Sequence, residues 1–351
     1  MRVLVTGHDG YIGAVMTPLF LEAGHEVVGL DSGLFEECLF GAGGGLAPVP
    51  TLRKDLRDVE ARDLEGFDAV VHLGGLSNDP LGDLDPELTV RINEEASLRL
   101  ARRARDAGAS RFLFSSSCST YGAAGDDFLD ESAAFNPVTP YGASKVRVEE
   151  GLRRLAREGA QEGARHGAFS PVYLRNATAY GVSPRLRLDL VLNNLVAWAH
   201  TTGRILMLSD GTPWRPIVHV EDISRAFLAA LEAPRDLVHD QAFNVGRTEE
   251  NYRIRELAEI VAETVPGCRI EYAEGAGPDK RCYRVDCSKI ERTLPGFRPR
   301  WDARRGAEEL YRAYRENDLT FERFEGADYK RLPRIRELLL AGRISTDLRW
   351  V

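Results

Sequence analysis

The sequence lacks any run of about 18 apolar residues, the length that a helix needs to span a membrane. It also lacks an excess of basic residues. The 54 acidic residues outnumber the 46 basic ones, and the formal net charge of -8 disfavours a nucleic-acid partner. A strand-like segment occupies the first residues, where a secretory signal would need an apolar helix. We therefore expect a cytoplasmic protein that binds neither membranes nor nucleic acid.

Cysteine is scarce, and its spacing does not indicate a metal site. Five cysteines lie at positions 38, 118, 268, 282 and 287, and no two have Cys-x-x-Cys spacing. No histidine lies near Cys282 and Cys287 in the sequence. We expect free thiols, as in a reducing compartment, and no bound metal.

Glycine, by contrast, is frequent, and three glycines form the clearest pattern in the chain. Residues 1–6 predict a buried strand, which a helix and a second strand over residues 26–30 follow. Gly7, Gly10 and Gly13 lie between the first strand and the helix. Glycines let the backbone turn sharply and approach a pyrophosphate, and a helix N-terminus offers free N–H groups to it. The arrangement predicts a dinucleotide site, with a merely glycine-rich loop as the alternative.

Two acidic residues lie at or after the ends of predicted strands that follow the glycine turn. Asp31 ends the second strand, where a carboxylate can bond both hydroxyls of an adenosine ribose and would repel a 2′-phosphate. This position favours NAD over NADP. Asp55 follows a short third strand and either accepts from an adenine amino group or belongs to a solvated charge run. The residues alone leave both readings open.

Small and hydroxyl side chains end two further predicted strands. The segment 67–75 ends in Gly74 and Gly75, and the segment 111–117 ends in three serines. Open parallel sheets bind ligands at the carboxyl ends of their strands. We therefore expect these ends to lie beside the dinucleotide, although serines that merely cap a strand would look the same.

Tyr141 and Lys145 are four residues apart on a predicted helix and share one helix face. An ammonium group beside a phenol lowers the pKa of the phenol from about 10 toward neutrality, and an oxidised nicotinamide adds a second positive charge. The phenolate can then accept a proton from a substrate hydroxyl while hydride leaves the carbon. The pair predicts hydride-transfer chemistry, and a helix pair without chemistry is the alternative.

Together these segments resemble an extended short-chain dehydrogenase/reductase of the NAD-dependent nucleotide-sugar epimerase and dehydratase family. The resemblance covers about residues 1–314. It rests on the glycine turn, on H-L-G-G at 72–75, on S-S-S-C-S-T-Y-G at 115–122 and on Y-G-A-S-K at 141–145.

The resemblance implies an α/β fold, a doubly wound parallel Rossmann sheet with a smaller C-terminal substrate-binding lobe. The NAD-binding domain is expected over residues 1–174, to which 216–248 return. The substrate lobe is expected over 175–215 and 249–315, and residues 316–351 form a C-terminal extension outside the usual pattern. This extension is expected to be an amphipathic cover, with a lid over the sugar pocket as the alternative.

Motif by motif, the resemblance also implies roles for single residues. The catalytic residues are Ser117, the base Tyr141 and its partner Lys145. The expected cofactor contacts are Gly7, Gly10, Tyr11, Ile12, Gly13, Asp31, Asp55, Leu56, Leu73, Gly74, Gly75, Ser115, Tyr141 and Lys145. The expected substrate contacts are Ser117, Thr178, Asn193, Asn194, Arg215 and Arg281.

The activity that the resemblance implies is NAD-dependent epimerisation of a nucleotide-diphosphate sugar through a transient ketone. The 4,6-dehydratase branch follows its catalytic threonine with Asp-Glu, whereas this chain has Cys118 and Ser119. The difference favours an epimerase over a dehydratase. The alternatives are an NDP-sugar dehydratase or ketosugar reductase, and a non-catalytic NAD(P)-sensing protein of the same fold. The resemblance also implies a homodimer through helices over 87–107 and 141–157.

Overall fold

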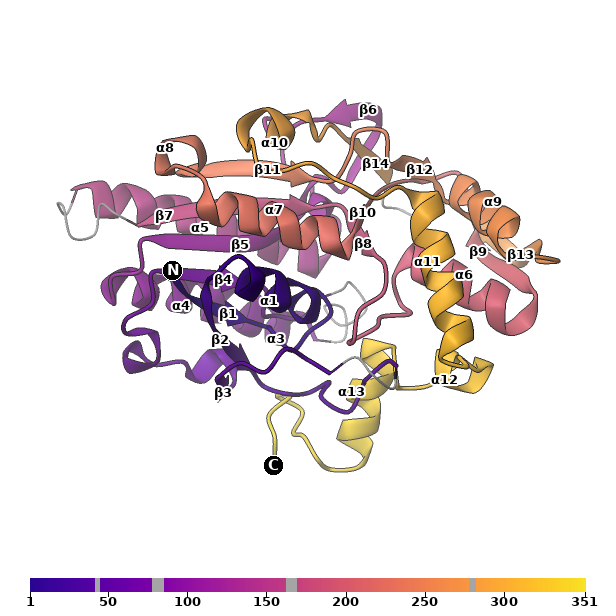
Figure 1. The fold of residues 1–351 in the computed structure, drawn as a ribbon, viewed down its shortest axis with the longest axis horizontal. Coiled ribbons are helices and arrows are strands. Elements are labelled where there is room, and N and C mark those ends of the chain that lie inside the picture. The colour runs from indigo at the N-terminus through magenta and orange to yellow at the C-terminus, as the bar shows by residue number, and fades with distance from the viewer. Residues whose placement is uncertain (42–44, 78–84, 162–168, 278–281) are drawn as a thin grey trace.

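A seven-stranded parallel sheet forms the centre of the computed structural model, which describes residues 1–41, 45–77, 85–161, 169–277 and 282–351 (Figure 1). The strand order is β11-β7-β5-β4-β1-β2-β3. These strands are β1 (Arg2–Thr6), β2 (Glu26–Asp31), β3 (Thr51–Arg53), β4 (Ala69–His72), β5 (Arg111–Ser117), β7 (Ser170–Asn176) and β11 (Gln241–Val245). The order reverses at β1, so ligands are expected at the carboxyl ends of β1 and β4.

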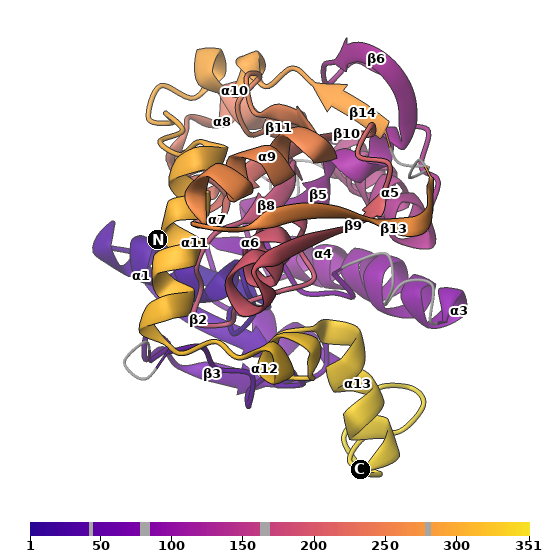
Figure 2. The same ribbon diagram turned by 90° about the vertical axis from the view of Figure 1, so that its right-hand side faces the viewer.

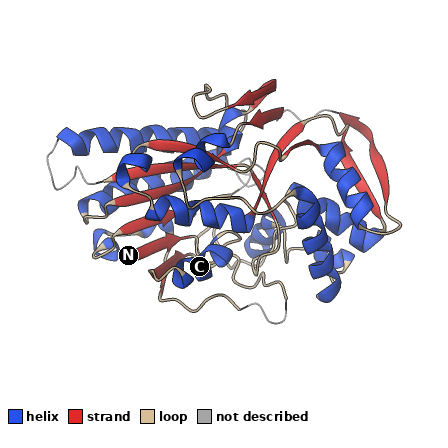
Figure 3. Ribbon diagram, turned by 45° about the horizontal axis from the view of Figure 1, so that its top comes forward, coloured by secondary structure: helices blue, strands red, loops and turns tan. Residues whose placement is uncertain are grey.

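Helices cover both faces of this sheet, as Figure 3 shows. Side chains alternate along a strand, so Val3 and Val5 of β1 face one side and Leu4 the other. The first side packs on α1 (Gly13–Glu22), α7 (Val220–Glu232) and α10 (Ser288–Thr293). The second packs on α4 (Ala96–Asp106) and α5 (Pro140–Gln161). The predicted α/β class with a doubly wound parallel sheet is confirmed.

The helix expected over residues 87–107 is interrupted by a π-helical segment. It consists of α3 (Pro86–Thr89), η3 (Val90–Glu95) and α4. Asn93 in η3 accepts from the backbone N–H of Leu76 at 2.7 Å and donates to the Leu76 carbonyl at 2.9 Å. A π-helical turn of this kind often serves a functional site. Here it fixes the backbone that leaves β4.

A smaller lobe lies beside the carboxyl ends of the strands, toward the viewer in Figure 2. Its core is made by apolar side chains of α6, β9, α9 and α11. The elements of this lobe include β8 (Thr178–Tyr180), α6 (Val191–Thr202), β9 (Arg204–Ser209), β10 (Trp214–His219), β12 (Asn251–Arg253), α9 (Ile254–Thr264), β13 (Arg269–Gly277) and α11 (Ala303–Glu316). Because β10 pairs with β8 and β12, and β13 with β9, this lobe has small sheets of its own. The expected domain boundaries stay a proposal.

Shorter elements complete the described chain. A two-stranded sheet joins β14 to β6. The remaining elements are η1 (Leu56–Asp58), η2 (Ala61–Leu64), η4 (Cys118–Tyr121), β6 (Ala123–Leu129), α8 (Arg235–Val238), β14 (Cys282–Val285), α12 (Phe321–Glu325) and α13 (Arg331–Leu340). Across the described ranges, no helix is both long and apolar enough to cross a bilayer.

The C-terminal extension folds back on the N-terminal half of the sheet. We call residues 331–351, which comprise α13 and the tail after it, the C-terminal cover. Figure 2 shows α13 at the same end of the molecule as β3. Its apolar side chains Ile335, Leu338 and Leu348 pack in one cluster with Leu76 and Ile92. The expected amphipathic cover therefore has a specific docking surface.

Candidate active site

A cleft of about 860 Å³ opens at the carboxyl ends of β1, β2, β4 and β5. Its size falls in the range of small-molecule sites, roughly 300–1,000 Å³. The smaller lobe supplies the opposite wall through β8, β10 and α6. The following predicted residues line it: Gly7, Gly10, Tyr11, Ile12, Gly13, Asp31, Asp55, Leu56, Leu73, Gly74, Gly75, Ser115, Ser117, Tyr141, Lys145, Thr178, Asn194 and Arg215.

Gly7 and Gly13 of the glycine turn have no room for a side chain. Gly7 has φ +74°, and a Cβ there would lie 2.9 Å from the backbone nitrogen of Gly74. A Cβ on Gly13 would lie 2.3 Å from the Gly7 carbonyl oxygen. In the described chain no side chain caps the N-terminus of α1, and its first turn holds no acidic residue. The turn therefore suits an anion at the helix N-terminus, as the pyrophosphate of a dinucleotide requires.

The predicted cofactor ligands Asp31 and Asp55 differ in their surroundings. The Asp31 carboxylate accepts a hydrogen bond from the Gly33 backbone at 2.8 Å, and burial raises the pKa of Asp31. Burial also acts to raise the pKa of Asp55, but hydrogen bonds from Arg57 hold that pKa below its usual value. Asp55 is therefore a charged acceptor at the edge of the cleft, fixed by a side-chain pair with Arg57 at 2.7 Å.

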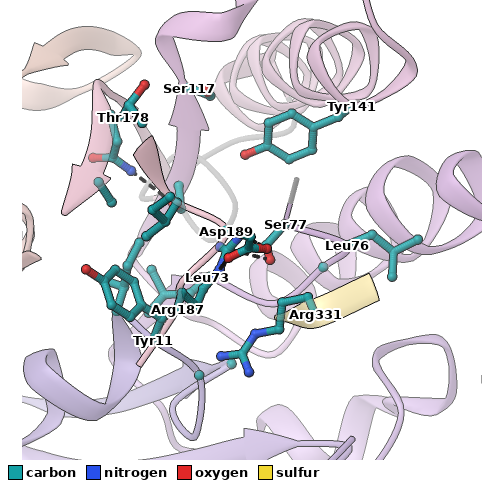
Figure 4. A pocket seen from close by; sticks show the side chains of 18 of the residues that line it. Tyr11, Leu73, Leu76, Ser77, Ser117, Tyr141, Thr178, Arg187, Asp189 and Arg331 are labelled. Atoms are coloured by element: carbon teal, nitrogen blue, oxygen red, sulfur yellow. Dashed lines mark hydrogen bonds and ion pairs between the residues drawn. The ribbon is translucent and has the colours of Figure 1, made fainter. Parts of the chain in front are cut away.

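Ser117, Tyr141 and Lys145 come from two adjacent elements, the end of β5 and the first turns of α5. Figure 4 shows Ser117 and Tyr141 on the same side of the cleft. The ammonium group of Lys145 donates to the Ser115 carbonyl at 2.8 Å and lies 5.5 Å from the centre of the Tyr141 ring. Burial lowers the pKa of Lys145 to about 8, and the charge of Glu149 partly offsets this. The predicted trio is thus gathered in one place.

A buried ion pair supports this trio from behind. Tyr141, Lys145 and Glu149 repeat every four residues along α5 and so share one helix face. Glu149 is fully buried, pairs with Arg175 through two hydrogen bonds of 3.0 and 2.7 Å, and accepts from Ser116 at 2.6 Å. The network joins α5 to β5 and β7, which fixes the helix that carries the predicted base.

Cys118 lies outside the cleft, although its neighbours Ser117 and Ser119 line it. The thiol is fully buried and donates to the Arg175 carbonyl at 3.1 Å. Burial raises the pKa of Cys118 above its ordinary value. The side chain therefore fills the core behind β5 and is not placed to exchange protons with a substrate.

The substrate side needs one correction. Asn194 lines the cleft, but its neighbour Asn193 does not. The Asn193 side chain is fully buried, accepts from the Gly181 backbone at 3.0 Å and donates to the Arg187 carbonyl at 2.9 Å. It therefore holds the loop before α6 instead of contacting a ligand. The predicted residue Arg281 lies outside the described residues.

Several cleft residues were not expected from the sequence. Asn176 at the end of β7 lines the cleft, and so do Ser77, Arg187 and Asp189. Arg187 pairs with Asp189 at 2.9 Å, and its Nη1 donates to the Ser77 hydroxyl at 3.3 Å. Arg331, Ile335 and Leu348 of the C-terminal cover also line the cleft. In the sequence, the segment R-L-R-L-D at 185–189 resembles an ordinary charge run, and only the fold reveals that it is buried.

Two relatives of this chain are named UDP-glucose 4-epimerase. The UDP-glucose 4-epimerase of Azospirillum brasilense is 31% identical over 301 residues, which are 79% of this chain and 82% of the relative. The UDP-glucose 4-epimerase of Bacillus subtilis is 28% identical over 335 residues, 88% of this chain and 94% of the relative. The similarity to the Bacillus enzyme extends over most of the length of both chains.

Solved structures share the fold and contain the expected cofactor. MoeE5 in complex with UDP-glucuronic acid and NAD aligns with a TM-score of 0.76 at 26% identity, covering 90% of this chain and 99% of that one. The complex of the Thermus thermophilus UDP-glucose 4-epimerase with NAD aligns with a TM-score of 0.72 at 25% identity and the same two coverages. The sequence model of the NAD dependent epimerase/dehydratase family matches residues 3–246. The chain belongs to the NAD dependent epimerase/dehydratase family.

Proposed function

We propose that this protein is an NAD-dependent epimerase of nucleotide-diphosphate sugars that works through a transient ketone. The observation that carries the proposal is the placement of Tyr141, Lys145 and Ser117 in the same cleft as the glycine turn and Asp31. A proton acceptor and a dinucleotide site in one cleft suit reversible oxidation of a sugar hydroxyl. The relatives named UDP-glucose 4-epimerase support this choice.

The residues of the chain divide the work as follows. When bound, NAD supplies reversible hydride exchange at a sugar carbon. Tyr141 accepts the proton of the sugar hydroxyl, because the nearby Lys145 ammonium favours the phenolate form. Ser117 holds the reacting oxygen by a hydrogen bond. Tyr141 then returns the proton once the keto sugar has presented its other face.

The other proposed contacts hold the two ligands. Asp31 would bond the adenosine ribose and Asp55 the adenine, and the glycine turn would hold the pyrophosphate. Arg215 and Asn194 line the wall formed by the smaller lobe, where they would bind the diphosphate of the sugar nucleotide.

The dehydratase alternative receives less support from the site. Elimination of water needs an acid and a base at the positions of Cys118 and Ser119. Cys118 is buried away from the cleft with a raised pKa, and Ser119 has no carboxylate. The complete trio of Ser117, Tyr141 and Lys145 also argues against a sensor without turnover, which would have no use for a proton acceptor.

A substrate panel tests the proposal. The purified enzyme is incubated with UDP-, dTDP-, GDP- and CDP-linked sugars without added NADH, and the products are separated from the substrates by chromatography. UDP-sugars come first, because the relatives and MoeE5 are named with them. We expect an epimer of one substrate at unchanged mass. A product lighter by one water, or turnover that consumes NADH stoichiometrically, would replace epimerisation by one of the alternatives.

We also propose a cytoplasmic homodimer. All five cysteines are free thiols, which suits a reducing compartment. The proposed interface uses the helices around residues 87–107 and 141–157, of which α4 and α5 pack on one face of the sheet. Sedimentation velocity at micromolar concentration tests the assembly, and a monomer there would contradict it.

A further inference from the structure

The C-terminal cover contacts the segments that follow both acids of the proposed adenosine site. The Trp350 indole donates to the carbonyl of Ser32, next to Asp31, at 2.7 Å. Arg57, the partner of Asp55, donates to the Asp347 carbonyl at 2.8 Å. The cover therefore lies over the cofactor end of the cleft, and the alternative of a lid over the sugar pocket finds no support in these contacts.

Apolar side chains of the C-terminal cover extend into the cleft. Ile335 and Leu348 of the cover line the cleft together with Leu34 and Phe35, which follow Asp31 in the chain. The four side chains belong to one packed cluster. An adenosine held by Asp31 would meet an apolar wall here instead of solvent.

Arg331 is a charged residue of the C-terminal cover that lies at the cleft. It is 3% exposed, yet it lines the cleft. Its guanidinium lies 4.1 Å from the centre of the Phe35 ring, and its Nη2 makes one long hydrogen bond of 3.4 Å to the Arg185 carbonyl. Among the described residues, its Nη1 atom is buried without a hydrogen-bond partner. A buried cation with an unpaired donor is costly unless an anion joins it.

The two arginines near Arg331 each form an ion pair with an aspartate, whereas Arg331 does not. Arg185 pairs with Asp9 at 3.0 Å, and Arg187 pairs with Asp189 at 2.9 Å. In the described chain no carboxylate forms an ion pair with Arg331. Figure 4 shows Arg331 close to Arg187 and Asp189, across the cleft from Tyr141. The local excess of one positive charge therefore points to an anionic ligand in the cleft.

The loop that packs against Arg331 is fastened to the glycine turn. Arg185 donates to the Asp9 carbonyl at 3.1 Å, and Ser183 donates to the Tyr11 carbonyl at 2.8 Å. The N-terminus of α1 would hold the cofactor pyrophosphate, so this is the anion expected nearest to these residues. The diphosphate of the sugar nucleotide is expected instead beside Arg215 on β10.

We propose that the C-terminal cover closes the NAD site on one side, and that its residue Arg331 binds the cofactor pyrophosphate from the side opposite the glycine turn. The C-terminal cover keeps NAD bound between turnovers, because the cofactor leaves only when the cover moves. The proposal rests on NAD as the cofactor and does not depend on which sugar reaction the enzyme performs.

The test compares Arg331→Met with Arg336→Met, an exposed arginine on the same helix. Methionine keeps most of the aliphatic length and removes the charge. We expect the dissociation rate of NAD to rise about tenfold or more in Arg331→Met, the effect of losing a charge-assisted hydrogen bond, and to stay unchanged in Arg336→Met. The rate is measured as release of bound NAD into an excess of a fluorescent NAD analogue, without any sugar nucleotide.

Equilibrium binding to the apo forms separates the phosphate role from a general loosening of the cover. ADP-ribose should bind more weakly to Arg331→Met, whereas adenosine and UDP should bind as they do to the wild type. Equal NAD release from both variants would overturn the proposal. Weaker adenosine binding to Arg331→Met would show that Arg331 acts by packing and not by binding phosphate. Weaker UDP binding would show that Arg331 binds the diphosphate of the sugar nucleotide. Either result would contradict the proposal.

Discussion

The ammonium group of Lys145 lies 5.5 Å from the centre of the Tyr141 ring and is held there by the Ser115 carbonyl at 2.8 Å. The hydrogen bond ties the end of β5 to the helix that carries the proposed base. Since Ser115 and Ser117 belong to the same strand end, the proposed proton acceptor and the hydroxyl proposed to orient the substrate are positioned together. The chemistry therefore depends on how β5 and α5 pack.

Tyr141→Phe keeps the ring and its packing but removes the proton acceptor. Loss of a general base costs roughly 10²–10⁴-fold in rate, and coupling to hydride transfer places our expectation toward the upper end. Ser117→Ala should cost less, because it removes one hydrogen bond to the reacting oxygen. Steady-state kinetics on the substrate found in the panel checks both, and a Tyr141→Phe enzyme with near-normal kcat would exclude Tyr141 as the base.

The alkaline side of the pH profile reports Lys145. Burial lowers the pKa of this lysine to about 8, so the free enzyme loses the ammonium charge as the pH rises through that value. The phenolate is then less favoured, and kcat/KM should fall above about pH 8. In Lys145→Arg, which stays charged because guanidinium pKa values exceed about 12, this limb should shift upward. If the alkaline fall in kcat/KM stayed at the same pH in Lys145→Arg, the assignment of this fall to Lys145 would be wrong.

Asp31 is expected to discriminate between the cofactors. Its carboxylate would face the 2′-phosphate of NADP, so NAD should bind about tenfold tighter or more, roughly 1.4 kcal/mol for each tenfold. Asp31→Ala should reduce the difference between the NAD and NADP affinities, because it removes the repulsion between the carboxylate and the 2′-phosphate. Titration of both cofactors into the apo protein measures it, and equal affinities in the wild type would remove Asp31 from this role.

Breaking the buried pair behind the trio should destabilise the fold. Glu149→Gln leaves the Arg175 charge buried without its partner, which typically costs about 3–5 kcal/mol. Glu150→Gln, on the exposed side of the same helix, is the matched control and should change stability by less than about 0.5 kcal/mol. Urea unfolding of the two variants measures the difference. Similar values for both would mean that the pair contributes little.

The sequence was informative where local pattern and chemistry coincide. The glycine turn, Asp31 and the pair Tyr141 and Lys145 could be predicted because their spacing is itself the geometry that they need. The doubly wound parallel sheet was implied by the resemblance of these motifs to a known family, and the fold confirms it.

Features that depend on packing between distant segments could not be predicted in the same way. Asn193 and Asn194 are neighbours in the chain, yet a helix points them in different directions and only Asn194 reaches the cleft. Arg331 lies 300 residues from Asp31, and no local pattern signals that its helix docks beside that strand. The C-terminal cover could be recognised as amphipathic but not assigned a place.

Solvent deuterium labelling tests hydride return most directly. The enzyme is run in deuterium oxide on its substrate without added NADH, and the carbon-bound positions of the epimer are analysed by nuclear magnetic resonance. If Tyr141 only exchanges the hydroxyl proton and the same hydride returns to the ketone, the product should carry no deuterium on carbon. Deuterium on any ring carbon would require a carbon acid in the mechanism and would contradict epimerisation by hydride return.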